Sequence, residues 1–376
     1  REKLERASWI RRMFEEGARL KAERGAENVF DFTLGNPEVE PPAEVGAAIR
    51  RALDDPAPHR HAYMPNAGFP EVRQAIADRL SRATGLEYTR DHVLMTVGAG
   101  GALNTVLKAI LDPGDEVIAL APFFVEYGFY AANHGGKLVL VETDPAFQLD
   151  VDAIEAAITP RTKAIILNSP NNPTGVIYPK SALDELGARL QRLDQPVTVI
   201  SDEPYKALTF DDAPVPEVPV SVPRTVIATS WSKALALPGE RIGYLAISPK
   251  LPDARELFDA CCFTLRTLGF VNAPALWQRV VAEVGHLTID IGPYQRKRDM
   301  MYRGLSGIGY DVVQPQGAFY MFPRTPVPDD VTFVQRLQEE GVLAVPGSGF
   351  GRGGHMRLTL TVSEDTIERS LEGFER

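Results

Sequence analysis

The chain contains 376 residues, of which 44% are hydrophobic and 24% charged, and it carries a formal net charge of −10. This composition is that of a globular protein large enough for two domains. The negative charge argues against a nucleic-acid-binding protein, which normally presents a basic surface. No apolar run approaches the roughly 20 residues that span a bilayer. We therefore expect neither nucleic acid nor a membrane among the partners.

The first part of the chain is rich in charge. Residues 5–24 have the periodicity of an amphipathic helix. Their many charges of both signs do not fit a signal peptide. A strand pattern at residues 30–34 follows and is broken at Gly35-Asn36-Pro37. The sequence thus predicts a helix and a short strand ahead of the main body of the chain.

Short β-branched runs alternate with helical patterns between about residues 90 and 247. The predicted strands are residues 93–97, 116–120, 137–141, 163–167, 197–201, 225–229 and 242–247. Helix-length segments between them include residues 102–111, 151–158 and 180–193. This alternation predicts an α/β fold, with a mostly parallel central sheet sandwiched by helices. Ligands of such folds bind at the carboxyl ends of the strands, where the connecting loops gather.

The last third of the chain has a different pattern. The proline-rich residues 211–223 are expected to form a surface loop. A long helical stretch begins after about residue 275, and a helix near residues 330–340 and a strand at residues 356–361 follow. The strict strand–helix alternation therefore does not extend over the whole chain.

A glycine-rich turn follows the first of the predicted sheet strands. Gly98, Ala99 and Gly100 come after an apolar strand and open a helix. The free backbone N–H groups of such a turn can face a phosphate, and glycine allows close backbone approach. A dinucleotide-binding turn has the spacing Gly-x-Gly-x-x-Gly, and Leu103 breaks that spacing here.

Polar clusters stand at the ends of two later strands. Residues 168–175 read Asn-Ser-Pro-Asn-Asn-Pro-Thr-Gly, and residues 201–205 read Ser-Asp-Glu-Pro-Tyr. Asp202 ends a buried run, where a carboxylate is costly unless it has a partner. The alternatives are a loop or helix-cap role for Asp202 and a turn-forming role for Asn172.

Lys233 lies in Ser230-Trp231-Ser232-Lys233, with Arg241 eight residues further on. An amine that condenses with a cofactor aldehyde holds that cofactor and can then act as a base at the substrate α-carbon. Arg241 can clamp a phosphate through two hydrogen bonds; its other interpretation is a surface ion pair. An amine, an acid, a phenol, an amide and an arginine are the groups needed to hold and use pyridoxal phosphate.

In their order and spacing these motifs resemble those of the class I/II aminotransferases, fold-type I enzymes that use pyridoxal 5'-phosphate. The resemblance covers nearly the whole chain. It implies an enzyme that moves an amino group between an α-amino acid and a 2-oxo acid through a Schiff base on Lys233. The implied catalytic residues are Lys233, Asp202 and Tyr205. The implied cofactor-binding residues are Gly98, Ala99, Gly100, Phe124, Asn172, Asp202, Tyr205, Ser230, Lys233, Arg241 and Tyr63.

Within that set the resemblance assigns individual roles. Asp202 would face the pyridine nitrogen, and Tyr205 and Asn172 would bond the ring oxygen of the cofactor. Phe124 would stack on the ring, although Phe123 could do so instead. No residue pattern is assigned to a metal site.

The same resemblance implies where the substrate binds. Gly35, Asn172 and Arg357 would bind it, with Arg357 on its α-carboxylate. Arg357 stands in an apolar strand, where an unpaired charge destabilises the fold unless an anion binds it. Tyr63 matches a tyrosine that reaches the phosphate of the neighbouring subunit, which implies a homodimer with shared active sites.

The family architecture implies two domains. Residues 46–274 would form the large cofactor-binding domain, and residues 1–45 and 275–376 a small domain built from both ends. The substrate side chain stays open, with Arg266, Arg11 and Arg12 as candidate contacts. Two other classes also stay open: another reaction on the same cofactor, such as a lyase, replacement or oxidase reaction, and a non-catalytic sensor.

The chain contains two cysteines, Cys261 and Cys262, which are adjacent in the sequence. Neighbouring cysteines rarely satisfy disulfide geometry, and so few in a long chain indicate a reducing compartment. We interpret the pair as small apolar residues packed in a helix, with a redox or metal role as the alternative. The expected location is the cytoplasm.

Overall fold

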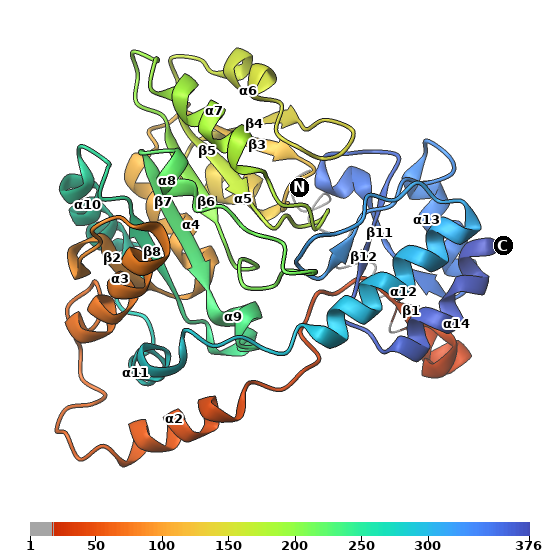
Figure 1. Ribbon diagram of the computed structural model, residues 1–376, viewed down its shortest axis with the longest axis horizontal. Helices are drawn as coiled ribbons and strands as arrows, with labels where there is room; N and C mark the ends of the chain where they lie inside the picture. Colours follow the sequence, from red (N-terminus) through yellow and green to blue (C-terminus); the bar gives the residue numbers. More distant parts are fainter. Residues whose placement is uncertain (1–16, 18) are drawn as a thin grey trace.

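The computed structural model describes residue 17 and residues 19–376. The seven strands predicted between residues 90 and 247 form one sheet, in the order β2-β8-β7-β6-β5-β3-β4 (Figure 1). Within it β8 runs antiparallel to both neighbours, and the other pairings are parallel. The mostly parallel sheet is confirmed. The bounds are β2 Val93–Thr96, β3 Glu116–Ala121, β4 Lys137–Glu142, β5 Thr162–Asn168, β6 Thr198–Asp202, β7 Thr225–Ser230 and β8 Gly243–Ile247.

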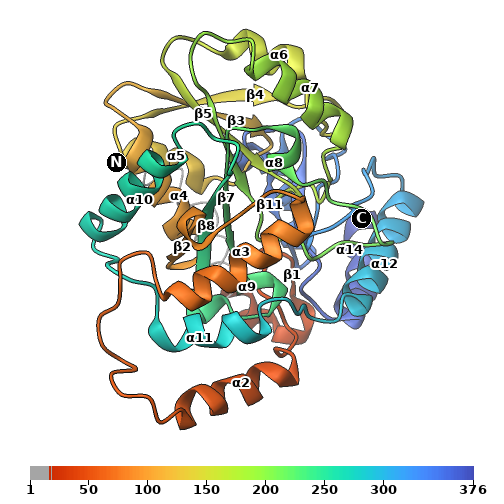
Figure 2. The ribbon, with the colours of Figure 1, turned by 60° about the vertical axis from the view of Figure 1, so that its left-hand side comes forward.

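Helices cover both faces of this sheet, as the alternation predicted (Figures 1 and 2). Successive residues of β7 point to opposite faces, so Val226 belongs to an apolar cluster with residues of α4 and α10, whereas Ile227 belongs to another with residues of α3 and α11. Apolar residues can occupy both sets of positions because both faces are buried. The covering helices are α3 Pro70–Thr84, α4 Gly98–Ile110, α5 Glu126–Asn133, α6 Val151–Ala157, α7 Lys180–Leu190, α10 Ala254–Thr267 and α11 Ala275–Val284.

Both ends of the described chain pack into a second region, on the right in Figure 1. Strand β1 (Phe30–Asp31) pairs in parallel with β10 (Val342–Leu343), and Phe32 shares a hydrophobic core with Phe319 and Phe374. A second small sheet has the order β11-β12-β9. The remaining elements here are β9 Tyr320–Met321, β11 Val345–Pro346, β12 Met356–Thr359, α12 Gly292–Ile308, α13 Asp330–Glu339 and α14 Glu364–Glu375.

Two segments of the chain differ in detail from the sequence-based expectation. The expected loop at residues 211–223 contains helix α8 (Val218–Ser221), whose neighbour Val222 is 1% exposed because it packs under the large sheet. The helical stretch after residue 275 is divided into α11 and α12. Of the helix expected at residues 5–24, residue 17 and residues 19–24 are described and helical; residues 1–16 and 18 lie outside the described part.

Helix α11 packs with the large sheet. It contacts α2 (Ala43–Asp54) and α3, and Val280 and Val281 lie in the same apolar cluster as Val93. This helix follows residue 274, where we expected the small domain to begin. No helix within residues 19–376 is long and apolar enough to cross a membrane.

Candidate active site

The predicted polar residues converge at one edge of the large sheet. Asn168 and Asp202 end the neighbouring strands β5 and β6 and are register partners. Ser230 ends β7 and pairs with Gly243 of β8, which also pairs with Thr96 just before the glycine turn. Parallel strands present their carboxyl ends at the same edge, so residues far apart in sequence gather there.

Asp202 is a buried carboxylate with one free oxygen. It is 5% exposed, and its Oδ2 accepts a 2.6 Å hydrogen bond from Tyr127 Oη. Its Oδ1 is buried and has no partner among the described residues. Burial raises the pKa of Asp202 to about 7, and the bond from Tyr127 opposes that rise. A cationic N–H group facing Oδ1 would satisfy this oxygen and favour the ionised carboxylate.

The loop that carries Asn172 is fixed against Asp202 by Asn168. The Asn168 side chain donates a 2.9 Å hydrogen bond to the backbone oxygen of Asp202. Its carbonyl oxygen accepts a 2.7 Å bond from the Asn172 backbone N–H. Asn168 therefore holds the turn and the carboxylate in one geometry. The turn role considered for Asn172 and a ligand role are compatible.

Lys233 lies on the short helix α9 (Trp231–Ala234) and points at the N-terminal segment. Its Nζ donates a 2.5 Å hydrogen bond to the backbone oxygen of Gly35. Burial lowers the pKa of Lys233, and the nearby cations Arg357 and Arg241 act in the same direction. A lysine in this environment releases its proton more readily than a surface lysine does.

Arg357 is a buried cation that joins three distant segments. Its Nη2 donates a 2.7 Å hydrogen bond to Thr33 O, and its Nη1 donates a 3.3 Å bond to Asn172 Oδ1. Its Nε is buried without a partner among the described residues. The guanidinium lies 4.6 Å from the ring centroid of Tyr320 and 4.7 Å from that of Phe350. Burial lowers the pKa of Arg357, and a bound anion would offset this cost.

Tyr320 lies next to Gly35 and Lys233, and Tyr205 contacts Tyr320. The hydroxyl groups of Tyr205 and Tyr320 are 3.2 Å apart. A Cβ atom at Gly35 would collide with Tyr320 Oη, so only glycine fits at that position. Burial raises the pKa of Tyr205 well above its ordinary value. The Tyr205 phenol therefore keeps its proton near neutral pH and can donate a hydrogen bond.

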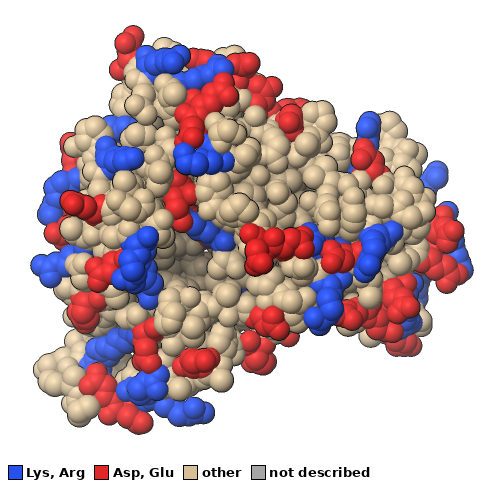
Figure 3. Space-filling view, in the orientation of Figure 1, with Lys and Arg blue, Asp and Glu red and all other residues tan. Residues whose placement is uncertain are grey.

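The glycine turn and Arg241 form a cationic cradle. Gly98 opens α4 with a φ of 69°, and a Cβ atom there would lie 2.7 Å from Arg241 Nη2. Arg241 itself has a φ of 51° and donates a 3.0 Å bond to Pro238 O. Figure 3 shows that the surface is hollowed in the part of this view where Figure 1 places α4 and α9. An anion in the cradle would meet both the guanidinium and the free N–H groups of the helix.

Aromatic residues border the carboxylate. Phe124 packs edge-on against Tyr127, with ring centroids 5.6 Å apart. Phe123 is held by the C-terminal segment, because its N–H donates a 3.0 Å bond to Phe350 O and its ring lies against Gly351. This arrangement favours Phe124 as the residue free to meet a flat ligand.

Other candidate residues lie apart from this group. Tyr63 is 92% exposed. Arg266 is exposed and lies over the ring of Phe263, 5.4 Å from its centroid. Arg11 and Arg12 lie outside the described residues. Cys261 is buried in the core beside α4. In the described part of the chain no group of three or more His, Cys, Asp or Glu residues could hold a metal ion.

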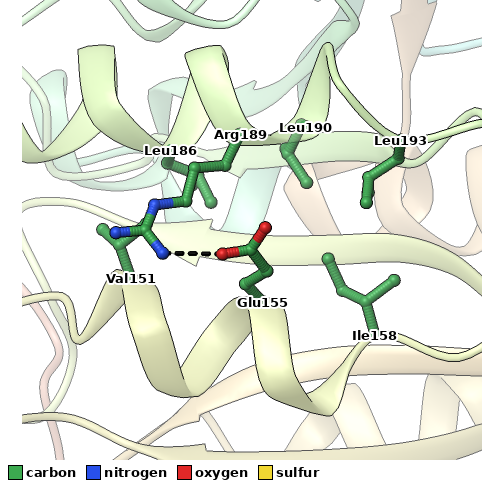
Figure 4. Close-up of a pocket in the computed structure, with 7 residues that line it drawn as sticks. All are labelled: Val151, Glu155, Ile158, Leu186, Arg189, Leu190 and Leu193. Atoms are coloured by element: carbon green, nitrogen blue, oxygen red, sulfur yellow. Dashed lines mark hydrogen bonds and ion pairs between the residues drawn. The ribbon is translucent and has the colours of Figure 1, made fainter.

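Two further hollows lie away from this group of residues. Figure 4 shows a crevice between α6 and α7, where Arg189 Nη1 lies 2.6 Å from Glu155 Oε2; it has no room for a water molecule. A cavity of about 530 Å³ is lined by Arg324, Arg352 and His355, among others. Neither hollow contains a predicted site residue.

Sequence reasoning missed two residues of the site, Tyr127 and Tyr320. Tyr127 belongs to a helix that no motif marked, and its tie to Asp202 spans 75 positions. Tyr320 lies in an apolar stretch typical of a buried strand, so the sequence suggested no role for its hydroxyl group. The hydroxyl itself could have indicated one, because a polar group at the end of a buried side chain needs a hydrogen-bond partner.

Comparison with known proteins identifies the family. The model of "Aminotransferase class I and II" matches residues 27–374. The chain belongs to this family. The "Aspartate/prephenate aminotransferase" of Thermus thermophilus is 38% identical over 95% of this chain and 93% of that protein. A "Probable N-acetyl-LL-diaminopimelate aminotransferase" of Bacillus subtilis is 32% identical over 93% of this chain and 89% of that protein.

Solved structures agree with this assignment. An amino transferase from Eubacterium rectale superimposes with a TM-score of 0.95 at 38% identity, covering 97% of this chain and 94% of that one. The aspartate aminotransferase of Thermus thermophilus with maleate gives 0.88 at 34% identity, covering 98% and 96%. The protein is a pyridoxal phosphate-dependent aminotransferase, and the expected family, fold, reaction and cofactor are confirmed.

Proposed function

We propose that the residues gathered at the sheet edge hold pyridoxal phosphate and the amino acid substrate in the roles expected from the sequence. One observation carries the assignment: Asp202 Oδ1 and Arg357 Nε are buried polar atoms without partners among the described residues. In addition, Lys233 is close enough to Arg357 for that cation to lower the pKa of the lysine. Unpaired buried polar atoms are costly in a stable fold, so a ligand that supplies a donor and an anion explains both.

The residues fit the cofactor. The protonated ring nitrogen of pyridoxal phosphate is the kind of donor that Asp202 Oδ1 lacks, and the cradle of Gly98, Ala99, Gly100, Ser230 and Arg241 suits its phosphate. Bound there, the cofactor supplies an aldehyde that captures amines and a cationic ring that accepts electrons. Asp202 keeps that ring cationic because an ionised carboxylate favours the protonated nitrogen.

The protein's own residues move the proton and orient the substrate. Burial favours the neutral amine of Lys233, whose Nζ would remove the proton from the substrate α-carbon and return a proton to the cofactor's aldehyde carbon. Tyr205 and Asn172 would donate hydrogen bonds to the cofactor's ring oxygen, and Phe124 would stack on the ring. Arg357 binds the substrate α-carboxylate through Nε and a terminal nitrogen, with Gly35 and Asn172 beside it.

For the substrates we propose aspartate as the amino donor and prephenate as an acceptor to be tested first. The support is the naming of relatives that are 38% and 37% identical to this chain, an "Aspartate/prephenate aminotransferase" and a "Probable aspartate/prephenate aminotransferase". Both compounds carry the carboxylate that Arg357 would bind. An aromatic donor is the useful comparison, because another relative, 29% identical, is named "Aromatic-amino-acid aminotransferase 2".

We further propose a homodimer of two-domain subunits located in the cytoplasm. The shared core of Phe32, Phe319 and Phe374 supports a small domain made from both ends, while the packing of α11 favours placing the boundary after residue 284. The 92% exposure of Tyr63 supports a contact with a second subunit. The buried, unpaired Cys261 fits a reducing compartment.

The test is a transamination assay on Lys233→Ala, with Lys108→Ala on the exposed face of α4 as the matched control. Removing Nζ should lower kcat by at least about 10⁴-fold, because one group supplies both attachment and proton transfer. The purified protein is given each amino acid in turn with 2-oxo acids, and the new amino acid is measured. Transamination at the normal rate by Lys233→Ala would show that the base is elsewhere. Turnover of other amino acids but not aspartate would reject the proposed donor.

A further inference from the structure

The hydroxyl of Tyr130 lies at the opening turn of α4. Tyr130 is on α5, three residues after Tyr127, so the two side chains leave the helix on the same face. A Cβ atom at Gly100 would lie 3.1 Å from Tyr130 Oη. The hydroxyl therefore occupies the space into which a side chain at residue 100 would project. It approaches the third residue of a helix whose first N–H groups have no partner within the helix.

The cation of the cradle acts on the same hydroxyl. Burial raises the pKa of Tyr130 to about 12, Glu126 adds to the rise, and Arg241 opposes it. Arg241 meets the turn at Gly98, so guanidinium and phenol approach α4 at positions 98 and 100. Because the phenol keeps its proton at neutral pH, it offers a donor there.

Tyr130 Oη makes no hydrogen bond to any residue in the described part of the chain, whereas Tyr127 Oη on the same helix is committed to Asp202. Gly100 leaves room for the phenol and itself adds no side-chain donor. Arg241 Nη1 donates a hydrogen bond to Pro238 O, whereas Arg241 Nη2 has no hydrogen-bond partner among the described residues. Two unused donors from different segments thus face the opening turn of α4, a pattern suited to an anion with several oxygens.

We propose that Tyr130 Oη donates a hydrogen bond to the phosphate of the cofactor, as a ligand additional to those expected from the sequence. The proposal rests on the proposed function, since it takes the turn at Gly98 and Arg241 as the phosphate site. It assigns to this chain a tyrosine from within the same subunit, distinct from Tyr63. The chemical class of the ligand is a phosphate monoester.

Tyr130→Phe removes the hydroxyl and keeps the ring. Pyridoxal phosphate is titrated into the cofactor-free protein, and so, separately, is pyridoxal, which has no phosphate. Binding of each is followed by fluorescence. Losing one bond to a charged acceptor should weaken pyridoxal phosphate roughly tenfold and leave pyridoxal unchanged. Tyr302→Phe, on α12, is the matched control and should change neither affinity. Gly100→Ala adds a Cβ at 3.1 Å from Oη and should weaken pyridoxal phosphate in the same selective way.

Two further results separate this proposal from the one on which it rests. If Arg241→Ala weakens pyridoxal phosphate selectively and Tyr130→Phe does not, Tyr130 is no phosphate ligand and the proposed site stands. If neither variant acts selectively, the phosphate lies elsewhere and both proposals fall. If Tyr130→Phe raises the KM of the amino acid and leaves cofactor affinity unchanged, the hydroxyl faces the substrate and the proposal is overturned.

Discussion

Asp202 and Arg357 are buried charges of opposite sign, and each keeps one buried atom without a partner among the described residues. They differ in how they are held. Asp202 ends a strand in the middle of the seven-stranded sheet, with Asn168 on the adjoining strand. Arg357 is held by residues 324 and 185 positions away, Thr33 and Asn172. The proposed cofactor end of the site is built into one sheet, whereas the proposed substrate end depends on the chain ends coming together.

This difference predicts separable effects. A change at Asp202 alters the charge of a rigid pocket, so it should appear in properties of the protein with no substrate present. A change at Arg357 alters a contact between segments, so it should appear mainly when substrate binds. Substitutions at Asp202, Arg357 and Tyr127 test this separation, and their expected effects decrease in that order.

Stability of the cofactor-free protein should depend on pH through Asp202. Its pKa is raised from 3.8 to about 7, so the unfolded chain ionises this carboxyl before the folded one does. The free energy of unfolding should therefore fall as pH rises from about 4 to about 7, by on the order of 4 kcal/mol. Denaturant unfolding of Asp202→Asn at several pH values should lack this component. Identical pH slopes in both proteins would show that Asp202 ionises normally when buried.

Arg357→Ala should lower kcat/KM for the amino acid roughly 100-fold, because it removes a charge-assisted pair of hydrogen bonds to the α-carboxylate. Affinity for pyridoxal phosphate should stay within about threefold. Arg357→Lys keeps the charge without the paired donors and should lie between these limits. Steady-state kinetics and cofactor titration check both quantities. If Arg357→Ala weakened cofactor binding more than substrate binding, Arg357 would belong to the cofactor site and the proposed separation would be wrong.

Tyr127→Phe should have the smallest effect, a loss of about tenfold or less in kcat. The hydroxyl donates to Asp202 Oδ2 and lowers the pKa of that carboxyl. Without it the pKa should rise, and the pH-dependent loss of stability should extend to higher pH. Unfolding of the cofactor-free variant across pH measures this shift, with Tyr302→Phe as the control. A shift to lower pH would contradict the assigned hydrogen bond.

Local patterns were enough for the large sheet and for the residues at its edge. Runs such as residues 197–201 are apolar and β-branched because both faces of a parallel strand are buried, so the pattern is strong. Asp202 and Lys233 stand in short motifs directly after such strands, where chemistry and position coincide. Helix α8 was missed because the prolines of residues 211–223 favour a turn when considered alone, while the burial of Val222 depends on its packing against a distant sheet.

Contacts between distant segments could not be predicted from local patterns. The pairing of β1 with β10 depends on two-residue strands, too short to leave a periodic signal, and only family resemblance implied that the ends meet. Tyr127 and Tyr320 act through bonds to residues 75 and 115 positions away. These hydroxyl groups find their partners only in the tertiary fold, and local secondary-structure propensity carries no information about such contacts.

The joining of the two ends also determines the order in which the protein can be completed during synthesis. Phe30 pairs with Val342, and Arg369 donates a 2.7 Å bond to Glu27 O. The opening segment therefore leaves the ribosome long before its partners exist, and such distant contacts form late. All strands of the large sheet are made by Ile247, so the proposed cofactor site can take shape on a growing chain, but the proposed substrate site must wait for Arg357 on β12.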